Sequence, residues 1–269
     1  MKSRHIAILL SVALLSALPA AAGTLDWVSR FRAAHGLAPL APEPALERAA
    51  AAYAAVLAAS GRLAHRDGEG HGPLVRYRAA GGSAARVGEI LGAGPDLAAV
   101  TAAWEASPAH AAAALDPRWT CVGAGSAPQR EAPEAPGSPG RARSSSTVLG
   151  PDGPDTASQT RVWVVLFAEQ RVEGFCVAAQ PRGGYLVLGA FRESAAAEVV
   201  LLSGLAAVPP AAWDPARREF RFFLPDGAGG RYHRLGYRTA AGDFVLTSAF
   251  YPERAVESAD APPFADAGG

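Results

Sequence analysis

The spacing of apolar residues divides the chain into a first part with helical periodicity and a second part with strand periodicity. Apolar residues recur at helical intervals in the first part, which predicts helices over 25–34, over 44–60 and from Leu97 onward. Thr24 and Asp96 stand where a short polar side chain can cap the first backbone N–H groups of a helix. Gly61 follows the second segment, and glycine commonly ends a helix in a left-handed conformation.

Short apolar runs and alternating patterns predict strands in the rest of the chain. Residues 121–122 and 161–167 would supply a sheet for the predicted helices. After residue 171, alternation between glycine-rich turns predicts strands at 175–179, 185–190, 198–202, 219–224, 232–237 and 244–251. A series of short strands of this kind is typical of a small β-sandwich. The predicted fold class is therefore α+β, with a mixed domain over 23–171 and an all-β domain over 172–257.

The remaining segments have compositions that do not favour a packed core. Residues 1–22 combine a basic start, an apolar run and small residues before Gly23, which is the pattern of a cleavable signal peptide. Residues 126–159 and 258–269 are rich in small residues and proline, and we expect both to be disordered. The protein is thus expected to be exported, to a periplasm or to the extracellular space. No later segment is apolar and long enough to span a membrane.

The net charge and the cysteine content bear on the partners and on the disulfide bonding that can be expected. The 25 basic and 25 acidic residues cancel, so the balance gives no reason to expect a nucleic-acid partner. Cys121 and Cys176 are the only cysteines. An even pair in an exported protein is compatible with a disulfide, and two buried thiols in strands are the alternative. The sequence leaves both open.

The segment Ser107-Pro108-Ala109-His110 joins a predicted helix start to a candidate site. Ser107 suits the N-cap position and Pro108 the first helical position, where the missing N–H of proline is harmless. His110 then falls in the first turn, where the helix dipole disfavours the imidazolium form. The ring should tend to stay neutral and able to bind a metal or accept a proton.

Several motifs, taken in order, resemble the CAP superfamily, also called the SCP-like or cysteine-rich secretory protein domain, in its bacterial form. They are Gly36-Leu37-Ala38-Pro39-Leu40, Leu63-Ala64-His65, Val87-Gly88-Glu89-Ile90, Trp104, Ser107-Pro108-Ala109-His110 and Pro117-Arg118-Trp119. The resemblance implies an α-β-α sandwich for the first domain, followed here by the added β domain. It also implies a ligand cleft that carries His65, Glu89, Ser107 and His110.

The cleft residues allow two interpretations. Two imidazoles and a carboxylate, His65, His110 and Glu89, could bind Zn²⁺ with an open fourth position, and the ion could acidify a bound water for hydrolysis. The compact His-Glu-x-x-His signature of metalloproteases is absent. The other interpretation is that His65 and Glu89 form a structural hydrogen-bonded pair.

The sequence departs from the family pattern at positions that matter for this choice. Ile90 stands where the family has Asn, and Ser107 where its animal members often have Glu. Because an acidic partner is missing, we expect a non-enzymatic module that binds an extracellular ligand or protein in the cleft, and the resemblance allows a lipid. The alternative is a metal-dependent hydrolase, a peptidase or esterase, that uses His65, Glu89 and His110.

One further loop contains several ligand-type side chains. Asp67, Glu69 and His71 alternate along it and could hold a cation. The segment lacks the ligand repeat and the closing Glu of an EF-hand. We therefore interpret it as a polar loop.

Overall fold

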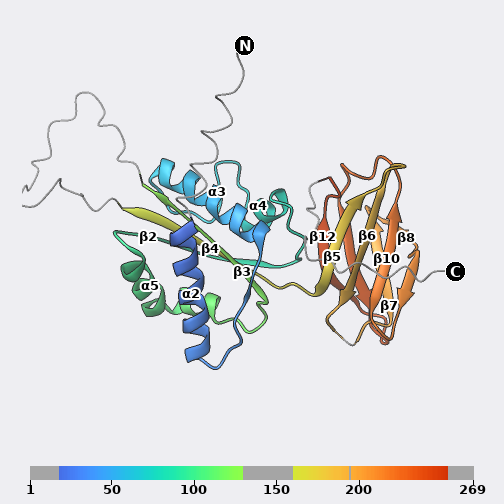
Figure 1. Ribbon diagram of the computed structural model, residues 1–269, viewed down its shortest axis with the longest axis horizontal. Helices are drawn as coiled ribbons and strands as arrows, with labels where there is room; N and C mark the ends of the chain where they lie inside the picture. Colours follow the sequence, from blue (N-terminus) through green and yellow to red (C-terminus); the bar gives the residue numbers. More distant parts are fainter. Residues whose placement is uncertain (1–17, 130–159, 194, 254–269) are drawn as a thin grey trace, which may run out of the picture.

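The computed structural model describes residues 18–129, 160–193 and 195–253. Figure 1 shows two parts, a mixed α/β domain at the N-terminal side and an all-β domain at the C-terminal side. The predicted α+β fold class is confirmed. The predicted tail over 258–269 and most of the predicted signal peptide and insert lie outside the described residues.

The helices of the described residues all belong to the first domain. They are α2 (Leu18–Ala34), α3 (Pro44–Ser60), α4 (Pro73–Ala79), α5 (Leu97–Ala106) and α6 (Pro108–Ala114). The predicted bounds of α3 are confirmed: Glu43 accepts a hydrogen bond from the backbone N of Leu46 at 2.8 Å, and Gly61 ends the helix at φ 66°. Asp96 caps α5 as predicted, accepting from the backbone N of Ala99 at 2.8 Å.

The start of α2 was predicted wrongly. The helix begins at Leu18 and not at Leu25, so Thr24 is a buried residue within it and not its cap. Alanines precede Gly23 and are strong helix formers, so the sequence on that side continues the helix without a break.

A four-stranded sheet separates two helical layers in the first domain. Its strands are β1 (Ala41–Pro42), β3 (Cys121–Pro128), β4 (Arg161–Ala168) and β2 (Val87–Gly94), in that spatial order. The pair β1–β3 is parallel, and the other pairs are antiparallel. Because β3 continues to Pro128, the predicted start of the insert at 126 was too early.

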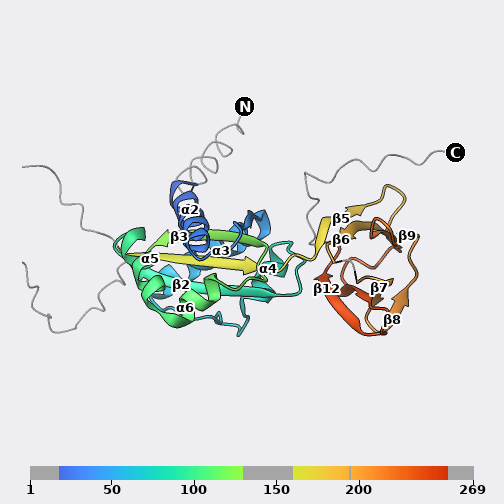
Figure 2. The same cartoon turned by 90° about the horizontal axis from the view of Figure 1, so that it is seen from below.

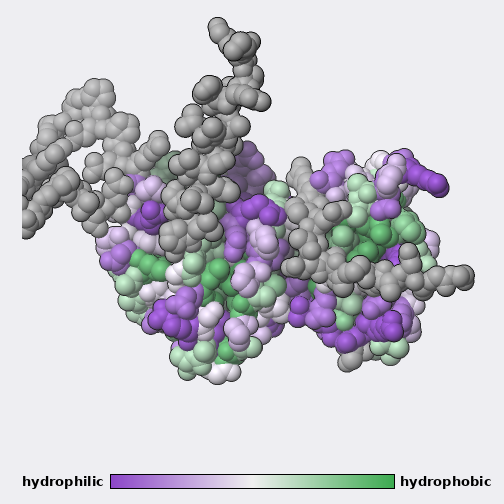
Figure 3. All heavy atoms as spheres, in the orientation of Figure 1, coloured by the Kyte–Doolittle hydropathy of each residue, from purple (hydrophilic) through white to green (hydrophobic). Residues whose placement is uncertain are grey.

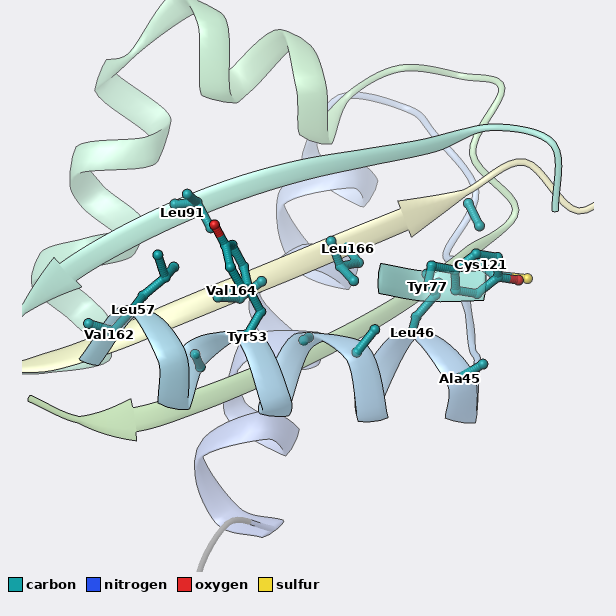
Figure 4. Packing of buried hydrophobic residues seen from close by; sticks show 14 of the residues in the cluster. Ala45, Leu46, Tyr53, Leu57, Tyr77, Leu91, Cys121, Val162, Val164 and Leu166 are labelled. Carbon is teal, nitrogen blue, oxygen red and sulfur yellow. The ribbon is translucent and has the colours of Figure 1, made fainter. Parts of the chain in front are cut away.

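The two faces of this sheet carry separate cores. On one face, α3 and α4 pack Leu46, Tyr53 and Tyr77 against Val164 and Leu166 of β4, as Figure 4 shows. On the other face, α2 and α5 bring aromatic residues onto the sheet, and the cluster also holds Ala114 of α6. Its large members are Trp27, Trp104, Trp119, Trp163 and Phe167. The α-β-α sandwich implied by the resemblance is thus present, and Figure 2 shows the layers from the side.

The second domain is a sandwich of two antiparallel sheets. One has the order β5 (Val172–Ala179), β6 (Tyr185–Phe191), β10 (Glu219–Leu224) and β9 (Ala212–Asp214). The other has the order β12 (Phe244–Phe250), β11 (His233–Arg238), β7 (Glu198–Ser203) and β8 (Ala206–Val208). Residues of both sheets form a single apolar cluster between them. The short strands β8 and β9 were not predicted from the sequence.

The two domains are joined by strand-like pairing as well as by the chain. Ala84 of the first domain forms an antiparallel bridge with Ser248 of β12, and the backbone N of Ala249 donates to the carbonyl of Ser83 at 2.8 Å. The hydroxyl of Tyr77 accepts from the backbone N of Ser83 at 3.2 Å and fixes this loop from inside the domain. Strand β12 is an edge strand, so the contact covers part of an otherwise unpaired edge.

The surface is mixed in polarity. On the face drawn in Figure 3, polar and apolar residues are interspersed over both domains. Among the residues that the structure describes, no helix is long and apolar enough to cross a membrane.

Candidate functional site

His65 and Glu89 form the centre of the candidate site. Glu89 lies on β2, an edge strand, and His65 lies in the loop after α3. The imidazole Nδ1 is 2.8 Å from the Glu89 Oε1 atom. Because an ionised carboxylate only accepts hydrogen bonds, the Nδ1–H donates and Nε2 is left for solvent or a ligand. The His65 side chain is 61% exposed and that of Glu89 only 1%. The pair therefore consists of a solvent-exposed imidazole whose orientation is fixed by a buried carboxylate.

Arg76 on α4 is a third member of this cluster, which we did not predict from the sequence. Its Nη2 atom donates to Glu89 Oε2 at 2.5 Å, and its Nη1 donates to the carbonyl of His71 at 2.7 Å. Its guanidinium carbon lies 3.4 Å from the ring centroid of Tyr53, a close cation–π contact. Both carboxylate oxygens of Glu89 are therefore engaged by cationic or imidazole donors.

Burial raises the pKa of Glu89 above its ordinary value, although its hydrogen bond to His65 and its interactions with Arg76 act in the opposite direction. The free-energy cost of removing the ionised carboxylate from water is thus larger than the stabilisation that His65 and Arg76 give to it. We expect the proton affinity of this group to respond strongly to any change in Arg76.

The loop after His65 is tied down by its own polar groups. Asp67 Oδ1 accepts from the backbone N of Glu69 at 3.0 Å and from the backbone N of His71 at 2.8 Å. The His71 Nδ1 atom is 3.3 Å from Glu69 Oε2 and 3.5 Å from Asp67 Oδ2. These contacts agree with the interpretation as a polar loop, and Arg76 anchors its end through the His71 carbonyl.

Ser107 and His110 lie apart from this cluster. Successive residues of a strand point to opposite faces of the sheet. The Cα of Gly88 faces the ring of Trp119 on the aromatic side, so the next residue, Glu89, points to the α3–α4 side. Helix α6, which carries His110, packs its Ala114 into the aromatic cluster.

The predicted metal ligands are accordingly brought together only in part. His65 contacts Glu89, whereas the buried Nδ1 atom of His110 has no hydrogen-bond partner in the described part of the chain. Within 18–129, 160–193 and 195–253, no three His, Cys, Asp or Glu side chains are grouped so that they could hold a metal ion.

The helix start at Ser107 is confirmed in position but not in its contacts. Ser107 is the N-cap residue of α6 and Pro108 its first residue, as predicted. The Ser107 side chain makes no capping hydrogen bond. Its hydroxyl therefore satisfies no backbone donor of the helix.

A groove of about 580 Å³ lies between α3 and α4, beside the cluster. Its floor includes Ala49, Ala52 and Tyr53, and Val56 is 51% exposed at its side. Arg48, Arg76 and Asp67 add charged groups to this mostly apolar wall, two of them positive. The groove was not predicted, because it depends on how a short helix, α4, lies across α3.

Cys121 and Cys176 are both buried and are not joined by a disulfide, which is the second of the two alternatives left open by the sequence. Cys121 begins β3, and Cys176 lies in β5 of the other domain. Burial raises the pKa of the Cys121 thiol, which lowers its reactivity.

Comparisons with known proteins identify a family relationship for the first domain. The sequence model of the cysteine-rich secretory protein family, CAP, matches residues 25–134. A search of curated proteins gives no match. Among solved structures, an outer surface protein from Borrelia burgdorferi has 21% sequence identity, over 54% of this chain and 89% of that chain, with a TM-score of 0.42.

Proposed function

Residues 25–134 belong to the CAP, or cysteine-rich secretory protein, family, and on that premise we propose that the protein is an exported binding module that is not an enzyme. Its ligand is an amphiphile with an apolar chain and a carboxylate head, such as a fatty acid. The chain lies in the groove between α3 and α4.

The lining of this groove is the observation that carries the proposal. Ala49, Ala52 and Val56 offer an apolar wall on successive turns of α3, which favours an apolar chain because its burial removes hydrocarbon from water. Arg48 lies at the same groove, and within the described part of the chain its one hydrogen bond is to the carbonyl of Ala80, at 2.9 Å. Its remaining donors suit a carboxylate head.

The His65–Glu89–Arg76 cluster supports binding better than hydrolysis. Glu89 is bonded on both oxygens, so it is poorly placed to ligate a metal or to take a proton from water. His110, the second predicted imidazole, belongs to α6, whose Ala114 packs into the aromatic cluster on the other face of the sheet. We infer that the cluster holds the loop after α3 against α4 and so keeps the groove open.

Export is proposed from the sequence of the first residues. Residues 1–22 have the pattern of a cleavable leader, of which 1–17 lie outside the described residues. Expression with the native leader should give a shorter protein outside the cytoplasm, beginning near Gly23. A full-length product that stays in the cytoplasm would contradict this part of the proposal.

Fluorescence titration with cis-parinaric acid tests the groove. Ala52 is exposed on α3 and lines the groove, so Ala52→Trp should fill it and weaken binding by about tenfold or more while the fold is kept. Ala55→Trp is the matched control, because Ala55 is exposed on the same helix but does not line the groove. Absence of binding to the wild-type protein, or equal binding by both variants, would reject the fatty-acid groove.

A zinc titration by calorimetry tests the hydrolase alternative. We expect no one-to-one binding of Zn²⁺ that is lost in a His65→Ala/His110→Ala variant. Micromolar binding that depends on both imidazoles would instead favour the metal-dependent hydrolase.

A further inference from the structure

A second cavity, of about 700 Å³, lies between the two domains. The first domain contributes Asp67, Glu69 and His71 from the loop after α3 and Arg78 from α4, and the β domain contributes Tyr232 and Tyr251, which directly flank β11 and β12. Cavities at domain interfaces are common ligand sites, and this volume suits a small molecule. The cavity shares Asp67, Arg76 and Ala79 with the α3–α4 groove, whereas Glu69, His71, Arg78 and the two tyrosines line the cavity alone.

The walls of the cavity are held in place by the contact between the domains. Ala84 is bridged to Ser248, and the backbone N of Ala249 donates to Ser83 at 2.8 Å. Tyr251 comes directly after this paired segment in the sequence. Arg78 follows Tyr77 on α4, and the Tyr77 hydroxyl fixes the loop that contains Ser83. The cavity is thus bounded by elements that are themselves paired or buried.

Arg78 is the cation of the cavity that forms no ion pair within the described part of the chain. Its guanidinium carbon is 5.2 Å from the ring centroid of Tyr232, and its Nε atom is buried without a hydrogen-bond partner. Among the described residues it has no ion pair, in contrast to Arg76, which is bonded to Glu89. A half-buried guanidinium with unused donors favours a ligand that offers acceptor oxygens.

The opposite wall offers acceptors. Glu69 has a carboxylate that is 81% exposed, and it lies 3.3 Å from His71. Asp67 uses one oxygen for the loop backbone, and its other oxygen is 3.5 Å from His71. A purely anionic ligand would be repelled by these two carboxylates, and a purely apolar ligand would leave the buried Nε of Arg78 without a hydrogen-bond acceptor.

A polyhydroxylated ring meets all of these demands together. Its hydroxyl groups can donate to Asp67 and Glu69 and accept from Arg78, and its C–H face can lie on an aromatic ring. Tyr232 and Tyr251 provide such rings as a tilted pair, with centroids 5.4 Å apart and an interplanar angle of 50°. From this combination we propose that the interdomain cavity binds a short saccharide, of about one or two sugar units by volume.

Saturation-transfer NMR with the full mature protein tests this site. The probes are cellobiose, maltose, lactose and di-N-acetylchitobiose, and the dipeptide alanyl-phenylalanine serves as a ligand with a ring and a carboxylate but no polyol. We expect at least one disaccharide to bind with a dissociation constant of about 1 mM or lower. Tyr232→Leu and Arg78→Gln should each weaken that binding by about tenfold.

Matched variants separate recognition from folding. Tyr232→Phe keeps the ring and should bind within about twofold of wild type. Phe223→Leu removes a 56% exposed ring elsewhere in the β domain, and Arg48→Gln removes an arginine of the α3–α4 groove, and both should leave saccharide binding unchanged. Binding of no disaccharide, binding of the dipeptide alone, or binding that survives Tyr232→Leu and Arg78→Gln would overturn the proposal.

The outcome is independent of the fatty-acid groove. Ala52→Trp should block cis-parinaric acid and leave the saccharide signal intact. Tyr232→Leu should do the reverse. Failure of one site therefore does not count against the other.

Discussion

Two carboxylates of the first domain sit among arginines, and their pKa values move in opposite directions. Glu89 is bonded to Arg76 and His65, and burial raises its pKa. Asp116, in the loop after α6, is bonded to Arg118 and Arg86, and its pKa falls to about 2, chiefly through the side-chain hydrogen bonds from Arg118. An arginine partner does not by itself decide the sign of the shift.

The difference lies in water access and in the number of donors. The Glu89 side chain is 1% exposed, and it has one guanidinium and one imidazole. The Asp116 side chain is 14% exposed, and it accepts from two guanidinium groups and from the backbone N of Arg118 at 3.0 Å. Desolvation therefore dominates at Glu89 and hydrogen bonding at Asp116. The charge balance of the buried cluster therefore depends on a single arginine, Arg76.

Arg76→Met should have the largest effect. It leaves the Glu89 carboxylate buried without its cation, which we expect to lower the free energy of unfolding by about 3 kcal/mol at pH 7. Chemical denaturation measures this change. Arg48→Met is the control, since Arg48 makes its hydrogen bond to Ala80 at an exposed position. A loss as small as that of the control would mean that Arg76 does not carry the charge balance.

Glu89→Gln should change the pH dependence of stability. A carboxyl whose pKa is raised in the folded state binds a proton more tightly there than in the unfolded chain, so its contribution is complete below the unfolded value of 4.5 and is lost as the pH rises through the raised value. The wild-type free energy of unfolding minus that of Glu89→Gln should therefore decrease as the pH rises above 4.5. Denaturation at a series of pH values tests this. A difference that grows with pH would show that pairing outweighs burial.

Two members of the His65–Glu89–Arg76 cluster were predicted from the sequence, and the third was not. His65 and Glu89 were named as a pair because each belongs to a motif of the resemblance. Arg76 was missed because α4 is only 7 residues long and has no periodic pattern of its own. Its contacts with Tyr53 and Glu89 exist only once α3, α4 and β2 are packed together.

The placement of His110 shows a second limit of sequence reasoning. The residue was grouped with Glu89 by resemblance, but the alternation within β2 offered a signal against it. Gly88 and Gly92 leave room for Trp119 and Trp104 on one face, so Glu89 between them had to face the other. Most of the longer helices and strands were predicted because burial of a whole face imposes a period, but β2, with 8 residues, was missed. The strands β8 and β9, with 3 residues each, depend on pairing partners alone.

Asp116→Asn should have a smaller effect than the change at Arg76. A carboxyl whose pKa is lowered in the folded state stabilises the protein above its unfolded value of 3.8, and this stabilisation is lost as the pH falls towards about 2. Because its arginine partners are partly exposed and screened by solvent, we expect a loss of about 1 kcal/mol at pH 7. Denaturation at pH 7 and at pH 3 should show that the difference between wild type and variant shrinks at the lower pH. An undiminished difference at pH 3 would assign the effect to packing and not to charge.

Arg118→Gln should have the smallest effect on stability and still move a pKa. The Arg118 side chain is 58% exposed, so its loss removes little stability, but it donates to both oxygens of Asp116, at 3.0 and 2.8 Å. Because these bonds are the main cause of the low value, the pKa of Asp116 should rise from about 2 towards 3.8, which a carboxyl-carbon NMR titration can follow. Arg86→Gln removes a single hydrogen bond to Asp116, of 3.0 Å, and should raise the pKa of Asp116 less. If the two variants raise the pKa of Asp116 equally, long-range charge and not hydrogen bonding sets this pKa. The difference between Asp116 and Glu89 would then rest on burial alone.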